Sequence, residues 1–123
     1  MDEQVRHALE HGRTIDITTI GRTSGQPRRI EIWFHNIDGH IYITGTPGRR
    51  DWYANLRANP SFIFHIKEGM QADLPAHATL IEDADAKRAI LKRIRDAIGR
   101  SDELESWVAQ SPLVEVAFGA TSL

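Results

Sequence analysis

Short segments in which apolar and polar residues alternate constrain the fold of this chain more than any other feature. The clearest example spans residues 29–36 and 40–44, which alternate on both sides of Asp38-Gly39. This dipeptide is typical of a two-residue turn between antiparallel strands. We therefore predict a β-hairpin with Ile41 and Ile43 facing inward. The same alternation predicts four further strands, at residues 14–20, 62–66, 76–81 and 114–118.

Two helices are predicted in the first half of the chain. Residues 2–11 carry Val5, Ala8 and Leu9 on one side and stop at Gly12. Asp51 is expected to cap a second helix, which runs to residue 58 and ends at Asn59-Pro60. Two aromatic residues and Leu56 lie on it. We expect Leu56 and Tyr53 to pack inward and Trp52 to border a ligand, because adjacent helical positions point about 100° apart.

The second half of the chain predicts a polar connection at residues 67–75 and two more helices. Residues 84–98 are amphipathic, and a short helix capped by Ser101 should follow. The apolar face of the first of these helices is expected to contain Ile90, Ile94, Ala97 and Ile98; that of the second, Leu104, Trp107 and Val108. About six strands without regular strand–helix–strand alternation indicate a mainly β fold with helices, an antiparallel barrel.

Composition narrows the class of protein. The chain has 123 residues, which we expect to form a single domain over residues 1–123. Lys and Arg number 15 against 17 Asp and Glu, so a nucleic-acid partner is not expected. There is no cysteine, which excludes a thiolate nucleophile or thiolate metal site. The charged N-terminal segment and the lack of an apolar run of about 18 residues predict a cytoplasmic protein without stable membrane insertion.

Two basic, glycine-containing turns suggest a site for an anion. In the first, GRTSGQPRR at residues 21–29, glycines let backbone amides approach a ligand, and the hydroxyl of Ser24 and three arginines add donors. A solvated hairpin turn explains the same residues equally well. The second turn, residues 45–50, brings Arg49 and Arg50 to the start of a helix, where the macrodipole also favours an anion.

Other chemistries have weaker support. His35, His65 and His77 fall on outward or lateral strand positions, but their spacing does not predict a metal site. Ser24 has no histidine and acid in a recognisable hydrolase order, which leaves nucleophilic catalysis unsupported. Neither a Walker-type phosphate loop nor a dinucleotide-binding glycine motif is present.

The sequence resembles the deazaflavin (coenzyme F420)-dependent nitroreductase family. The resemblance lies in GRTSGQPRR, the following IEIWF, the hairpin DGHIYITG and the segment DWYANLRANP. It covers about residues 14–66. Members of that family are flavin or deazaflavin oxidoreductases on a split β-barrel related to the pyridoxamine-phosphate-oxidase-like, FMN-binding fold. The resemblance implies that fold here, and leaves open whether the chain is a monomer or a homodimer.

What the resemblance implies for the site can be stated residue by residue. The turn from Arg22 to Arg29 would meet the phosphate and acidic tail of coenzyme F420, and the strand end at Thr44, Gly45 and Thr46 would border its ring. Two departures from the family are Gln26, where a basic residue is common, and a short loop at residues 45–51. The candidate cofactor-binding residues are Arg22, Ser24, Gln26, Arg28, Arg29, Thr44, Gly45, Thr46, Arg49, Arg50, Trp52 and Asn55.

The resulting hypothesis is an enzyme that passes a hydride to an electron-poor small molecule, such as a quinone, an enone or a nitroaromatic. The cofactor carries this chemistry, while the protein binds and orients it. Tyr42, Tyr53 or water would supply the accompanying proton, and the sequence does not choose among them. Two alternatives remain: an FMN-dependent enzyme of the same fold, and a non-catalytic barrel that carries lipid, haem or flavin.

Overall fold

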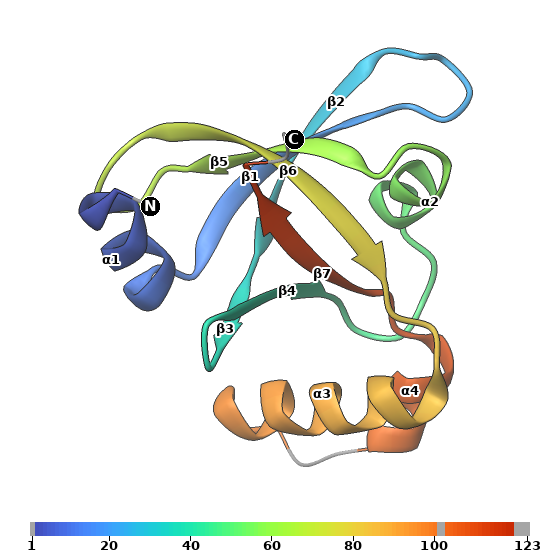
Figure 1. The fold of residues 1–123 in the computed structure, drawn as a ribbon. Helices are drawn as coiled ribbons and strands as arrows, with labels where there is room; N and C mark the ends of the chain where they lie inside the picture. Colours follow the sequence, from blue (N-terminus) through green and yellow to red (C-terminus); the bar gives the residue numbers. More distant parts are fainter. Residues whose placement is uncertain (1, 101–102, 120–123) are drawn as a thin grey trace.

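The computed structural model describes residues 2–100 and 103–119, and the described chain folds as a curled antiparallel sheet with four helices attached (Figure 1). Within these residues the strand order is β2-β1-β5-β6-β7-β4-β3. The strands are β1 (Thr14–Ile20), β2 (Pro27–Trp33), β3 (His35–Ile37), β4 (His40–Thr44), β5 (Ser61–Ile66), β6 (Ala72–Leu80) and β7 (Leu113–Phe118). The helices are α1 (Glu3–His11), α2 (Asp51–Ala58), α3 (Ala84–Ala97) and α4 (Leu104–Gln110). The predicted antiparallel barrel with helices is therefore confirmed.

The strand predicted over residues 29–36 is in fact two strands that meet at Phe34. β2 pairs with β1, Trp33 opposite Thr14, whereas β3 pairs with β4, His35 opposite Tyr42. The amide of Phe34 donates to the carbonyl oxygen of Arg13 at 2.9 Å, where the chain crosses from one partner to the other. Alternation runs unbroken through this crossing, so the pattern carries no sign of it. The Asp38-Gly39 turn itself is confirmed, with φ of 54° and 87° at its two residues.

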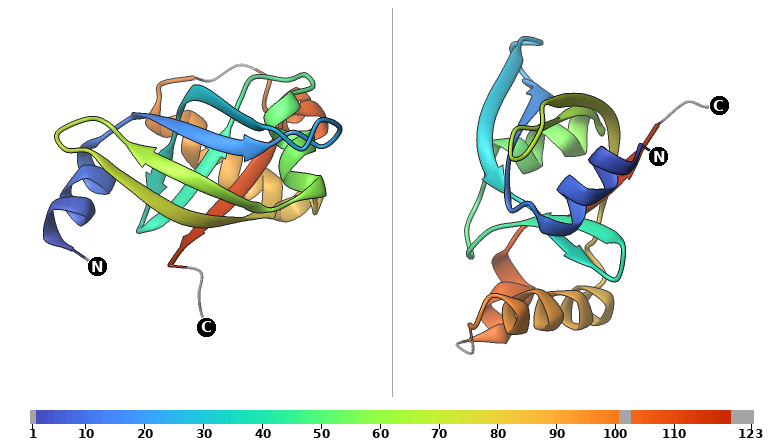
Figure 2. Two further views of the ribbon diagram at one scale, coloured as in Figure 1. Left: turned by 90° about the horizontal axis from the view of Figure 1, so that it is seen from above. Right: turned by 90° about the vertical axis from the view of Figure 1, so that its left-hand side faces the viewer.

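The interior of the barrel is filled from the strands and closed by a helix at each end. Ile17, Ile43 and Phe64 are fully buried between the strands. At one end α1 buries Val5, Ala8 and Leu9, as predicted, and the Asp2 carboxylate caps it by accepting from the amides of residues 4 and 5. At the other end α2 buries Leu56 (Figures 1 and 2). Both ends of the curled sheet are thereby covered.

A second apolar cluster lies outside the barrel, between β4 and the helices α3 and α4. Tyr42 faces this cluster, whereas its neighbours Ile41 and Ile43 face the barrel, so β4 is buried on both sides. Leu91 and Ile94 on α3 meet Trp107 on α4 there. The expected face of α3 is thus wrong in part: Ala97 is exposed and Ile98 follows the helix.

Two further boundaries differ from the prediction. β6 begins at Ala72 rather than at residue 76, because Ala72 already pairs with Ile66 and Pro75 lies within the strand opposite Ile63. The sequence did not predict this start, because proline is unusual within a strand and the alternation before Pro75 is short. Ser101, the predicted cap, lies outside the described residues; α4 begins at Leu104, and Leu104, Trp107 and Val108 are packed in the second cluster as expected.

The packing of α3 gives a test of the second cluster. Ile94 is fully buried, whereas Ile90 on the same helix is only partly buried. Ile94→Ala should therefore lower the free energy of unfolding by about 2–5 kcal/mol, and Ile90→Ala by clearly less. Chemical denaturation of both variants measures the difference, and equal losses would mean that α3 packs on another face.

Candidate cofactor site

Two hollows lie on either side of α2. The first, called here the turn pocket, has a volume of about 960 Å³ and is lined by Thr19, Gly21, Arg22, Thr23, Ser24, Pro27, Arg28, Arg29, Ile30, Asp51, Trp52 and Asn55. The second, called the α2–α4 pocket, has a volume of about 610 Å³ and is lined by Gly48, Arg49, Arg50, Tyr53, Arg57, Glu82, Lys87, Val108, Ala109, Gln110, Ser111 and Pro112. The two basic turns predicted from the sequence thus reach different sides of one helix.

The turn between β1 and β2 is held by its own backbone. The amide of Gly21 donates to the carbonyl oxygen of Gln26 at 2.8 Å, and the amide of Gly25 donates to that of Gly21 at 2.9 Å. Ser24 Oγ accepts from the amide of Gln26 at 3.1 Å. A Cβ on Gly21 would lie 2.5 Å from Ser24 Oγ, so a larger residue there would require the Ser24 side chain to move.

Asn55 ties this turn to α2. Its Oδ1 accepts from the Arg22 amide at 3.1 Å and from Arg22 Nη1 at 2.9 Å, and its Nδ2 donates to Thr19 Oγ1 at 3.2 Å. Asn55 is only 3% exposed, which makes these bonds costly to lose. Arg22 and Asn55 both line the turn pocket and fix its wall, and their predicted contacts with the cofactor remain predictions.

Asp51 does not cap α2, contrary to the prediction. The helix begins one residue after Arg50, which has extended backbone angles and makes no side-chain cap. Asp51 is instead inside the first turn, where its negative charge interacts favourably with the helix macrodipole. Its carboxylate accepts a hydrogen bond from Arg22 Nη2 at 3.3 Å. The aspartate thus joins the helix to the basic turn.

The three arginines of the first turn have different partners. Arg22 is bonded to α2, and Arg29 Nε pairs with Asp16 Oδ2 at 3.0 Å. Hydrogen bonds from Lys67, and then from Arg29, hold the pKa of Asp16 below its usual value. The Arg28 side chain has no hydrogen bond or ion pair with any part of the chain that the structure describes, and it lines the turn pocket. Its guanidinium is the free cation of this pocket.

The second basic turn shows the same division. Arg50 folds back, with Nη2 donating to the carbonyl oxygen and Oγ1 of Thr46, each at 3.0 Å, and its guanidinium covers Gly45. Arg49 makes no side-chain contact of this kind within the described residues, and it faces the α2–α4 pocket. Each pocket therefore has one arginine whose donors remain available to an anion.

Thr44 connects the second turn to the start of β7. Its hydroxyl donates to the carbonyl oxygen of Pro112 at 2.5 Å, and the amide of Gly48 donates to that of Gln110 at 3.0 Å. Thr44 is buried and lines neither pocket. Gly45, Thr46 and Gln26 line neither pocket either. Their predicted contacts with a cofactor remain predictions, and the role seen for Thr44 is to hold the loop.

The two candidate proton donors are far from equivalent. Tyr42 is packed in the second apolar cluster and lines neither pocket. Tyr53 lines the α2–α4 pocket, with the Arg57 guanidinium 5.4 Å from its ring centre. Burial, and then the charge of Glu82, raise the pKa of Tyr53 above its ordinary value. Of the two tyrosines, only Tyr53 borders a hollow.

The predicted packing of the α2 aromatics is reversed. Trp52 is 6% exposed and belongs to the barrel core, whereas Tyr53 is only partly buried against it. The two rings meet edge to face at 5.8 Å between centroids. Trp52 still lines the turn pocket, so one side chain serves the core and the pocket wall. Helical geometry separates adjacent positions by about 100° but does not say which one faces the core.

The histidines do not form a metal site. Among the described residues, no three His, Cys, Asp or Glu side chains are grouped so as to bind a metal ion. His65 is buried rather than outward, with Nε2 2.7 Å from Thr18 Oγ1 and Nδ1 2.7 Å from Asp73 Oδ1. Burial, with a contribution from Arg13, lowers the pKa of His35 to about 4.

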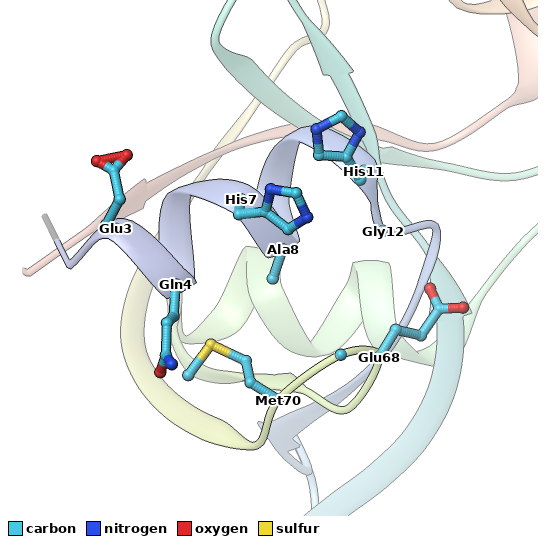
Figure 3. A pocket seen from close by; sticks show the side chains of 9 residues that line it. Glu3, Gln4, His7, Ala8, His11, Gly12, Glu68 and Met70 are labelled. Atoms are coloured by element: carbon cyan, nitrogen blue, oxygen red, sulfur yellow. The ribbon is translucent and has the colours of Figure 1, made fainter.

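A third pocket lies under α1, at the opposite end of the barrel from α2 (Figures 2 and 3). Its volume is about 510 Å³, and it is lined by His7 and His11, whose rings are tilted to each other with centroids 4.3 Å apart. Figure 3 shows Met70 and Glu68 on the facing side. The Glu68 carboxylate accepts from the amides of Arg13 and Thr14, both at 2.7 Å. No lysine or arginine lines this pocket, which makes it a poor site for an anion.

Sequence reasoning missed most of the residues that line the α2–α4 pocket, Lys87 and Ser111 among them. Lys87 is on the buried face of α3, four residues before Leu91, and Ser111 lies just after α4. A lysine at a core-facing position of an amphipathic helix was a signal that the sequence offered. Ser111 had no such signal, because its position depends on how α4 meets β7.

Solved structures with the same architecture define the class. An F420 reductase matches with a TM-score of 0.73 and 19% identity, over 99% of this chain and 98% of that one. A candidate pyridoxamine 5'-phosphate oxidase from Listeria innocua matches with a TM-score of 0.69 and 16% identity, over 95% and 92%. A conserved hypothetical protein from Mycobacterium tuberculosis matches with a TM-score of 0.69 and 23% identity, over 97% and 81%. The fold is a split β-barrel of the pyridoxamine-phosphate-oxidase-like kind.

The sequence narrows this class to one family. Residues 2–117 match the family of F420H2-dependent quinone reductases, and the chain belongs to that family. It is therefore an oxidoreductase, and its cofactor is the deazaflavin coenzyme F420. The donors of the turn pocket fit this coenzyme, because the unpaired guanidinium group of Arg28 suits a phosphate or carboxylate group. No helix in the described part of the chain is long and apolar enough to cross a membrane.

The aromatics of α2 give a test of this site. Trp52→Ala should lower the free energy of unfolding by about 3–5 kcal/mol, because a buried aromatic leaves a cavity. Tyr53→Ala should cost less, since Tyr53 is partly exposed. Denaturant unfolding of both variants compares them. A larger loss for Tyr53→Ala would show that Tyr53 is the residue that anchors α2.

Proposed function

We propose that this protein transfers a hydride from reduced coenzyme F420 to an electron-poor small molecule, a quinone, an enone or a nitroaromatic. The observation that carries the proposal is the pair of free guanidinium groups, one in each hollow beside α2. Arg28 provides an anchoring point for an anionic coenzyme in the turn pocket. Arg49 lies in the α2–α4 pocket, whose lining is partly apolar. A quinone is the acceptor that the family description favours.

The division of labour follows from the contacts of each pocket. Arg28, with Ser24 and the amides of the glycine turn, would hold the phosphate and acidic tail. Arg22 and Asn55 keep that turn against α2. In the α2–α4 pocket, Val108 and Pro112 supply apolar contacts for a planar acceptor, and Tyr53 offers a neutral hydroxyl as hydrogen-bond donor.

The roles of the protein and the coenzyme are separate in this scheme. Bound coenzyme F420 supplies the hydride, and the chain supplies position, exclusion of water and donors for the acceptor oxygen. FMN carries a phosphate too, so the turn alone does not distinguish it from the deazaflavin. A cytoplasmic location, the absence of a nucleic-acid partner and a homodimeric state remain predictions.

Two measurements test the proposal: turnover with menadione, and coenzyme binding by the Arg28→Ala variant. The protein should oxidise reduced coenzyme F420 in the presence of menadione. Arg28→Ala should weaken coenzyme binding by about 1.5–3 kcal/mol, the range for one charge-assisted contact, without changing the thermal midpoint. Fluorescence titration measures the binding.

Arg6→Ala is the matched control, because Arg6 is an exposed arginine on α1 that pairs with its neighbour Glu3. Equal affinity in Arg28→Ala and Arg6→Ala would show that the turn does not bind the coenzyme. No turnover with menadione or with any enone or nitroaromatic would contradict the proposed reaction.

A further inference from the structure

Lys87 is a lysine in an unusual place. It lies on α3 in register with the buried residues Leu91 and Ile94, and only 8% of it is exposed. Within the described residues its side chain has no hydrogen bond and no ion pair, and it lines the α2–α4 pocket. Most of the side chain is buried, whereas its ammonium group reaches the pocket, and charged groups in such places gather at functional sites.

Ser111 contributes an independent observation to the same pocket. Its side chain is 3% exposed, and its Oγ has no hydrogen-bond partner among the described residues. Only its amide is bonded, to the carbonyl oxygen of Trp107 at 2.8 Å. Buried hydroxyl groups are normally satisfied, so a lining hydroxyl without a partner points to a ligand atom that completes it.

The charges that face the pocket favour an electron-rich ligand atom. The cations are Arg49, Arg50, Arg57 and Lys87, and the only carboxylate among the lining residues is that of Glu82. Arg57 Nη2 holds Glu82 at 2.6 Å, which leaves that carboxylate already neutralised. Lys87 and Ser111 are therefore potential donors at a pocket whose lining charges are mostly positive. An oxygen that carries or gains negative charge is the group that would fit them.

We propose that Lys87 and Ser111 bind the oxygen of the electron acceptor in the α2–α4 pocket, and that the Lys87 ammonium protonates this oxygen after hydride transfer. The assignment rests on the proposed function above. For a quinone, hydride addition gives the hydroquinone monoanion. A Lys87 N–H bond then breaks as the O–H bond of the hydroquinone forms, leaving a neutral amine. Solvent returns the proton to the amine.

The protonation chemistry is consistent with this role. Burial lowers the pKa of Lys87, which makes its ammonium a stronger acid than that of a surface lysine. The pKa of Tyr53, the other proton donor in the pocket, is raised by burial. Tyr53 remains a neutral hydrogen-bond donor beside Lys87.

The first experiment measures binding without turnover. The probe is 2-hydroxy-1,4-naphthoquinone, a quinone that is an anion at neutral pH, titrated against the coenzyme-free protein by tryptophan fluorescence. Lys87→Met and Ser111→Ala should each weaken its binding, Lys87→Met by tenfold or more. Lys92→Met is the control, because Lys92 is exposed on the same helix and pairs with Asp96. Equal affinity in Lys87→Met and Lys92→Met would overturn the proposal.

The second experiment separates charge from proton donation. Lys87→Arg keeps the positive charge but does not release a proton at accessible pH. It should bind the naphthoquinone nearly as well as the original protein, while kcat with menadione falls at least tenfold. The fall of kcat at alkaline pH, where Lys87 loses its proton, should disappear in this variant. An unchanged kcat and an unchanged pH profile would show that Lys87 is not the donor.

The coenzyme provides the check on what the pocket holds. Affinity for coenzyme F420 should be the same in Lys87→Met as in Lys92→Met. If Lys87→Met instead loses coenzyme affinity tenfold and keeps naphthoquinone affinity, the pocket holds the acidic tail of the coenzyme and the assignment is wrong. If the original protein neither binds the coenzyme nor reduces menadione, the proposed function fails, a result distinct from failure of the Lys87 variants alone.

Discussion

The hydrogen bonds of one buried amide, that of Asn55, hold the site in shape. This side chain accepts from Arg22 and donates to Thr19, and so connects α2, β1 and the basic turn at one point. The turn itself is closed by its own backbone, so it would otherwise be a protruding hairpin end. Its attachment to α2 converts it into one wall of a pocket. Arg28 then faces this pocket with its charge unpaired.

The same helix separates two cationic hollows with different linings. The turn pocket is lined by glycine, hydroxyl and arginine groups, which suits phosphate and carboxylate. The α2–α4 pocket adds an apolar wall and the side chains of Tyr53 and Lys87. Since α2 is short, its position depends on packing of Trp52 and Leu56 into the barrel. Stability and binding therefore depend on the same eight residues.

Much of this arrangement could be predicted from local sequence. Alternation and the Asp38-Gly39 turn predicted the antiparallel barrel, and the turn GRTSGQPRR together with DWYANLRANP predicted the family. Local patterns did not reveal the crossing at Phe34, because alternation continues through it while the pairing partner changes. Nor did they separate Trp52 from Tyr53, since the direction in which a helix packs is a tertiary property. Ser111 lines the α2–α4 pocket because of how α4 packs next to β7, which local sequence does not reveal.

The central claim is that this barrel selects a deazaflavin. Parallel fluorescence titrations of the purified protein with coenzyme F420 and with FMN test it most directly. We predict that FMN binds at least tenfold more weakly, a difference of about 1.4 kcal/mol, because it lacks the acidic tail that Arg28 and the basic turn can bind. Tighter binding of FMN than of coenzyme F420 would contradict the account.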